Sequence, residues 1–304
     1  MTLPPMLRWL KLAAVLTLWA FSFILNEVAL RTMDAVVVVA GRWTVTAALT
    51  WLLLARRGQL GRFSAALRVD WRHFFVLSLV GVTLLYGLQV VGQSRTSAVN
   101  AGLLANMVPV FTALLATTVL HKRLRGIGWL GIIVALTGAW LVSAAQQPAA
   151  EGVSGLGLKL SASSALGDLL VLASSLVAAL YFIFGSRLLK AYPPLIVTAA
   201  AATLGAATLV PLALLFGRGS TITWPAVGAV IALGIGPGLL ANLWWWETVE
   251  WLDASRAAVY IYLIPLITMG FAVLILNEPL GPAQVLGAAL VLSGVWLAER
   301  GHPT

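Results

Sequence analysis

Long uncharged apolar segments recur along the whole chain and limit its fold more than any other feature. A helix that crosses the hydrocarbon core of a bilayer needs about 20 apolar residues. Eight windows near that length contain no charged residue: 74–94, 96–120, 126–150, 169–186, 191–217, 219–246, 257–277 and 279–298. Two more segments precede them. The first, 12–26, extends further if the side chain of Lys11 reaches the headgroups, and the second, 35–55, is interrupted by Arg42. The sequence therefore predicts an all-α membrane protein with ten transmembrane helices.

The scarcity of charged and metal-binding residues excludes several other classes of protein. Only 10% of the residues are charged, whereas soluble domains carry about 25%. The chain has no cysteine and three histidines, so we expect no disulfide, no metal site and no cofactor. An intramembrane enzyme would need a nucleophile–base pair or a metal cluster at membrane depth, and the sequence offers neither. We therefore predict that the protein is not an enzyme.

The lysines and arginines predict how the chain crosses the membrane. Cytoplasmic connections retain positive charge, and alternate connections of the ten-helix arrangement hold fourteen and four basic residues. This asymmetry predicts that the N- and C-termini are both cytoplasmic. Topology and anionic headgroups also account for the net charge of +9, so no nucleic-acid partner is expected.

The second part of the chain matches the first at an offset of 156 residues. The pairs that coincide are Pro109 with Pro265, Gly131 with Gly287, Gly138 with Gly294 and Trp140 with Trp296. Because the matched helices would cross the membrane in opposite directions, the sequence predicts two inverted five-helix repeats, an arrangement typical of transporters. We expect a first repeat over 1–147, an extracytoplasmic linker over 148–165 and a second repeat over 166–304.

Several short motifs, in their order and spacing, resemble those of the EamA-type transporters of the drug/metabolite transporter superfamily. They are Trp-Ala-Phe-Ser-Phe at 19–23, Val-Pro-Val-Phe at 108–111, Gly-Ala-Trp-Leu at 138–141, Ile-Pro-Leu at 264–266 and Leu-Asn-Glu-Pro-Leu at 276–280. The family usually has Gly-Glu directly after the helices that correspond to 96–120 and 257–277; Glu278 matches the second, whereas the first place holds His121 and Lys122. The chain looks most similar to YddG-type exporters of aromatic amino acids. The resemblance implies an alternating-access exporter.

Polar and aromatic residues on the inner helix faces are the candidates for substrate binding. Tyr86, Gln89 and Gln93 share one face of the helix predicted over 74–94, and the repeat places Asn242 and Trp245 at the first two of these positions in the helix predicted over 219–246. The other candidates are Trp19, Phe23, Asn26, Asn106, Tyr181, Tyr260 and Tyr262. Two interpretations remain open for the amides, because they either line a central cavity or hold helices together.

If these residues line a central cavity, its wall is apolar with neutral hydrogen-bonding groups. A wall of this kind suits a small zwitterion with an apolar or aromatic side chain. Arg42 is the one basic residue inside a predicted span. It either binds a substrate carboxylate at the outer mouth or extends to the headgroups.

In the Trp244-Trp245-Trp246 run the rings point about 100° apart on a helix, and we expect Trp246 in the cytoplasmic aromatic belt.

Glycines and prolines carry two further expectations. Gly131, Gly138 and their repeat partners are predicted to let the helices over 126–150 and 279–298 pack closely. Pro109 and Pro265 are predicted to be paired hinges, although a static bend is the alternative.

Taken together, these features predict a monomeric carrier in the lipid bilayer of a bacterial-type inner membrane that exports amino acids, including aromatic ones. An exporter of another metabolite or drug, or a solute channel, is the alternative.

Overall fold

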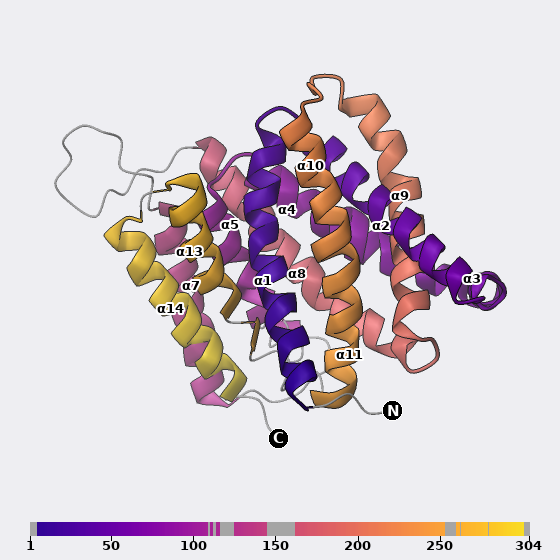
Figure 1. Ribbon diagram of the computed structural model, residues 1–304. Coiled ribbons are helices and arrows are strands. Elements are labelled where there is room, and N and C mark those ends of the chain that lie inside the picture. Colours follow the sequence, from indigo (N-terminus) through magenta and orange to yellow (C-terminus); the bar gives the residue numbers. More distant parts are fainter. Residues whose placement is uncertain are drawn as a thin grey trace.

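The computed structural model describes residues 5–108, 110–111, 114–115, 125–144, 162–252, 260–261, 263–278 and 280–300. Every regular element in these residues is helical (Figure 1). The elements are α1 (Pro5–Leu30), α2 (Ala35–Arg56), α3 (Leu60–Ser78), η1 (Leu79–Leu84), α4 (Leu85–Gln93), α5 (Ala98–Leu104), η2 (Ala105–Met107), α7 (Gly126–Ala144), α8 (Ala162–Leu189), α9 (Pro194–Phe216), α10 (Trp224–Leu233), η3 (Gly234–Ala241), α11 (Asn242–Leu252), α13 (Leu263–Leu276) and α14 (Pro282–Arg300).

The prediction of an all-α chain with ten helical segments is confirmed for the described residues. α3, η1 and α4 form one continuous helix, as do α10, η3 and α11, so each predicted window contains one described segment. Six of the segments are long and apolar enough to cross a membrane, and α7, α13 and α14 are shorter apolar helices. Large apolar side chains also face outward, including Trp224 and Leu274, as lipid contact requires.

One connection and one helix end differ from the prediction. Residues 60–73, predicted as part of a connection, are helical, and α3 bends at Asp70, whose backbone leaves helical geometry (φ −117°, ψ 30°). The hydroxyl of Tyr192 donates to the Asp70 carboxylate at 2.6 Å, and this bond raises the pKa of Tyr192. α3 extends past the rest of the bundle (Figure 1). α8 begins at Ala162, inside the predicted linker.

Each half of the chain contains a stretch of π-helix at the equivalent place. η1 spans Leu79–Leu84, and the same residues displaced by 156 lie within η3, which spans Gly234–Ala241. In η3 the side-chain amide of Asn242 donates to the carbonyls of Pro237 and Gly238, both at 2.9 Å. The hydroxyl of Thr46 donates to the carbonyl of Gly234 at 3.0 Å. Polar side chains therefore satisfy backbone carbonyls that the wide turn leaves outside the α-helical pattern.

α7 and α14 form a close pair at one edge of the bundle (Figure 1). A Cβ atom on Gly131 would lie 2.6 Å from the carbonyl oxygen of Gly294, and one on Gly294 would lie 2.7 Å from that of Gly131. Gly138 and Gly287 oppose each other in the same way, at 2.8 and 3.0 Å. These two contacts, the glycine seam, run in opposite order along the two helices, so α7 and α14 are antiparallel. The predicted packing role of the four glycines is confirmed.

The two ends of the bundle have different contacts. The first turn of α1 and the last turn of α14 lie at the same end, the lower one in Figure 1, as an even number of crossings requires. At this end Lys11 of α1 pairs with Glu247 of α11 at 2.5 Å. At the other end two connections meet, where Thr221 donates its backbone N–H to the carbonyl of Thr32 at 2.7 Å and Asp34 donates its own to the hydroxyl of Ser220 at 2.8 Å.

Candidate functional site

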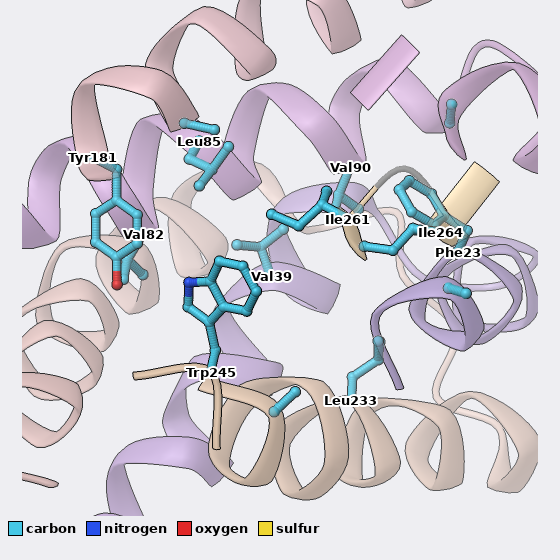
Figure 2. Close-up of a cluster of buried hydrophobic side chains, with 14 of the residues drawn as sticks. Phe23, Val39, Val82, Leu85, Val90, Tyr181, Leu233, Trp245, Ile261 and Ile264 are labelled. Atoms are coloured by element: carbon cyan, nitrogen blue, oxygen red, sulfur yellow. The ribbon is translucent and has the colours of Figure 1, made fainter. Parts of the chain in front are cut away.

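Aromatic rings from both halves of the chain meet where α1, α2, α4 and α11 approach one another. The ring centroids of Trp19 in α1 and Trp245 in α11 are 5.1 Å apart, and both residues were predicted from the sequence. Figure 2 shows Trp245 pointing toward apolar side chains from several other helices. The residues drawn around it include Val39, Val82, Leu85, Val90, Tyr181, Ile261 and Ile264. We name two ring pairs, Trp19 with Trp245 and Trp43 with Tyr86, the aromatic centre.

Tyr86 lies against two consecutive residues of α2. Its ring centroid is 5.1 Å from that of Trp43, and the guanidinium carbon of Arg42 lies 4.4 Å from the Tyr86 centroid. The sequence did not predict Trp43 as a site residue. Because most side chains in α2 are apolar, hydrophobicity alone does not reveal which of its faces is turned inward.

Arg42 is buried, and one interpretation of it was therefore wrong. Only 1% of the residue is exposed, so the side chain does not extend to the headgroups. It forms no ion pair with an acidic residue of the described segments, and its Nε has no hydrogen-bond partner there. A desolvated cation–π contact contributes about 2 kcal/mol, whereas the burial of an ion costs several kcal/mol. The contact with Tyr86 offsets only part of that cost.

Several of the candidate amides hold helices or turns together, which is the second of the two interpretations that the sequence left open. The Asn26 amide donates to the side-chain oxygen of Gln93 at 3.2 Å, and Gln93 donates to the carbonyl of Phe23 at 2.6 Å, joining α1 to α4. Asn106 donates to the carbonyl of Gly102 in its own helical turn at 2.7 Å, and Asn242 is engaged in η3. These donors are not free for a ligand.

Gln89 differs from these amides. It lies one turn beyond Tyr86 on α4 and is half-buried. No side-chain hydrogen bond joins it to the described residues. Its amide is therefore the one on the predicted face of α4 that is free to bind a solute.

Tyr181 and Trp246 pack together inside the bundle. Their ring centroids are 6.0 Å apart, and the Tyr181 ring lies directly against Gly81 of η1, where no Cβ would fit. Trp246 is 3% exposed, so its predicted place in the aromatic belt was wrong. The belt position fits Trp9 and Trp71, which are 44% and 55% exposed.

Tyr260 lies apart from the aromatic centre. Its ring centroid is 5.5 Å from that of Trp9, and Trp9 in turn lies 5.2 Å from Trp251, near the beginning of α1. Pro265 is buried in the first described turn of α13. Tyr262 and Pro109 lie outside the described residues, so the paired hinge stays a prediction.

Glu278 joins the second half of the chain to the first. Its carboxylate accepts the backbone N–H groups of Ala98 and Val99, at 3.2 and 3.3 Å, in the first turn of α5. Burial raises the pKa of Glu278, and the two backbone hydrogen bonds partly oppose the rise. The repeat places Lys122 at the equivalent position, so the first half carries no such carboxylate.

A comparison with protein families decides the identity of this helical bundle. The model of the EamA-like transporter family matches residues 7–144 and again residues 165–299. The chain belongs to the EamA-like transporter family. Both matches together cover most of the chain, and the members of this family are transporters.

Similar proteins cover almost the whole length of this EamA-like chain. An uncharacterized transporter of Archaeoglobus fulgidus is 30% identical over 95% of this chain and 96% of its own length. A probable terminal-alkyne amino-acid exporter of Streptantibioticus cattleyicolor is 27% identical over 96% and 93%. A solved crystal structure shares the fold, with a TM-score of 0.66 and 20% identity over 95% of both chains.

Proposed function

We propose that this EamA-like protein is an alternating-access exporter of small organic solutes, most of all amino acids with apolar or aromatic side chains. The observation that carries the proposal is the contact of Trp19 with Trp245 at 5.1 Å, in which each half supplies one ring. Gln89, with its free amide, lies on the same inner face as Tyr86. Large apolar surfaces with few neutral polar groups suit an amino acid better than a phosphorylated sugar.

The proposed mechanism uses two inverted halves that exchange conformations. The glycine seam supports it, because Gly131 opposes Gly294 and Gly138 opposes Gly287, as a two-fold relation between the halves would produce. The π-helical stretches support it as well, since they occupy equivalent places in the two halves. Under such symmetry each half can take the conformation of the other, which opens the centre to either side of the membrane.

The decisive experiment is counterflow in proteoliposomes that contain the purified full-length chain. Liposomes loaded with unlabelled phenylalanine should accumulate labelled phenylalanine transiently and saturably. A sugar nucleotide outside should not compete. Flux that does not saturate and shows no exchange would favour a channel instead, and exchange of the sugar nucleotide alone would reassign the solute.

We propose that the protein lies in the inner membrane with both termini in the cytoplasm. A separate experiment tests this orientation. The chain contains no cysteine, so single cysteines report their location without background. Arg218→Cys should react with a membrane-impermeant maleimide in intact spheroplasts, whereas Arg57→Cys should react only after lysis. The reverse pattern would invert the topology. A monomer is expected in detergent by light scattering.

A further inference from the structure

Arg42 places a buried positive charge beside the aromatic centre. The residue is eight positions into α2 by sequence, about 10 Å along the helix from its first residue. It is 1% exposed. A charged side chain at such a depth in a membrane protein is costly and ordinarily pairs with a group that compensates its charge.

Two N–H groups on consecutive residues of α2 lack acceptors among the described residues. The Nε of Arg42 and the indole Nε1 of Trp43 are both buried, and neither has a hydrogen-bond partner among the described residues. The guanidinium carbon of Arg42 lies over the Tyr86 ring, 4.4 Å from the ring centroid. This contact leaves the Nε–H of Arg42 without an acceptor among the described residues, so it can donate to a ligand.

Three described acidic residues that could have paired with Arg42 have other partners. Glu247 pairs with Lys11, and Asp168 accepts a hydrogen bond from Thr96 at 2.6 Å. Glu278 binds the first turn of α5, at 3.2 and 3.3 Å. Arg42 therefore has donors and a positive charge but no anion from these side chains.

We propose that Arg42, assisted by the Trp43 indole, binds the carboxylate of the transported solute, a role that rests on the proposed function as an exporter. Carboxylates match the planar donor geometry of a guanidinium, and the pair is strong where water is excluded. The solute's apolar body would then lie against Tyr86 and Trp245, which provide aromatic surface. The substrate class is small carboxylates with an apolar or aromatic body.

The same arrangement assigns a lesser role to the amino group of an amino acid. The side chains of the aromatic centre are neutral, and the free polar group on α4 is the Gln89 amide. None of them supplies a negative charge for an ammonium group. The carboxylate is therefore required for transport, whereas the amine is dispensable.

Three solutes that share one aromatic body separate these requirements. Phenylalanine carries both charged groups, 3-phenylpropionate carries the carboxylate alone, and phenethylamine carries the amine alone. In counterflow at pH 7, with protein-free liposomes as the control for passive leak, the wild-type protein should exchange the first two. Phenethylamine should exchange at a rate at least about tenfold lower, equivalent to about 1.4 kcal/mol.

The matching variant is Arg42→Gln, which keeps a polar side chain but removes the charge. It should slow the exchange of both carboxylates by about tenfold or more, while Arg218→Gln, in the exposed connection between α9 and α10, should leave them unchanged. Equal exchange of phenethylamine and phenylalanine by the wild type would overturn the proposal. So would carboxylate exchange that survives in a well-folded Arg42→Gln.

A binding measurement keeps the proposal testable if Arg42→Gln does not fold. 3-Phenylpropionate should raise the Tm of the wild-type protein in detergent, and phenethylamine should not. The opposite pattern would overturn the assignment of Arg42. If the wild type exchanges phenylalanine without needing a carboxylate, only this inference fails; if it exchanges none of the three solutes, the proposed function fails with it.

Discussion

The glycine seam and the aromatic centre both lie where the two halves of the chain meet, but they are built differently. In the seam each half supplies the same residue type at equivalent positions, as with Gly131 and Gly287. In the centre the equivalent positions differ, since Tyr86 corresponds to Asn242 and Gln89 to Trp245. The glycine contacts of the seam follow the repeat, whereas the side chains proposed to contact the solute do not. A solute without two-fold symmetry needs such an uneven site.

The strongest way to break the seam is to add a side chain to it. Gly294→Leu would place its Cβ 2.7 Å from the Gly131 carbonyl oxygen, a contact with backbone that only a shift of the two helices can relieve. We expect a loss above about 3 kcal/mol in the free energy of unfolding, seen as a lack of monodisperse protein in detergent. Gly270→Leu on α13 is the control, because nothing lies within 4 Å of its Cβ. Equal Tm values for both variants would refute the close packing of α7 and α14.

A milder change tests the aromatic centre. Trp245→Phe keeps an aromatic ring but removes the indole N–H and part of the contact with Trp19. We expect a loss of about 1–2 kcal/mol in stability and a larger loss in the exchange of aromatic solutes than of aliphatic ones. The control is Trp224→Phe, because Trp224 is 88% exposed. Parallel losses for both solute types would make Trp245 a packing residue.

The two halves also differ in the link between their first and third helices. Gln93 joins α4 to α1 through Asn26 and the carbonyl of Phe23, and the repeat places Val249 at the equivalent point. Gln93→Val should lower the free energy of unfolding by about 1 kcal/mol, measured by thermal denaturation in detergent. Gln89→Val, on the same helix, should leave it unchanged. If the two variants lose the same amount, the link through Gln93 contributes nothing of its own.

The smallest effect concerns the single carboxylate that joins the halves at α5. Because the pKa of Glu278 is raised in the folded protein above its ordinary value of 4.5, its contribution to stability is complete below that value and is lost as the pH rises through the raised pKa. Glu278→Gln should remove this part of the pH dependence of Tm. Identical profiles for the variant and the wild type, measured from pH 4 upward to about pH 8, would contradict the assignment.

The sequence predicted the helices and the seam because both have local signals. Uncharged windows of spanning length locate helices, and glycines repeated at a fixed offset mark close packing, as at Gly131 and Gly287. The inner faces were harder to predict, because lipid and protein interior are equally apolar and hydrophobicity does not distinguish them. For that reason Trp246 was assigned to the belt, although it packs against Tyr181, and Trp43 was missed.

Arg42 and the amides show a second limit. The sequence placed Arg42 inside a span but could not say whether its guanidinium would reach the surface, since that depends on Tyr86 and Trp43 around it. It likewise proposed Gln93 and Asn26 as ligand groups, although the two bond to each other. Pairing between distant side chains decides such roles, and no periodicity encodes it.

The π-helical stretches η1 and η3 have a consequence for any attempt to redesign this protein. One added residue in a turn rotates everything beyond it by roughly 100° about the helix axis, so Tyr86 points where an unbroken α-helix would have put its neighbour. Deleting a single residue from η1 would therefore leave the composition of α4 intact and turn its inner face away. The backbone geometry of η1 therefore sets the direction in which the side chains of α4 point.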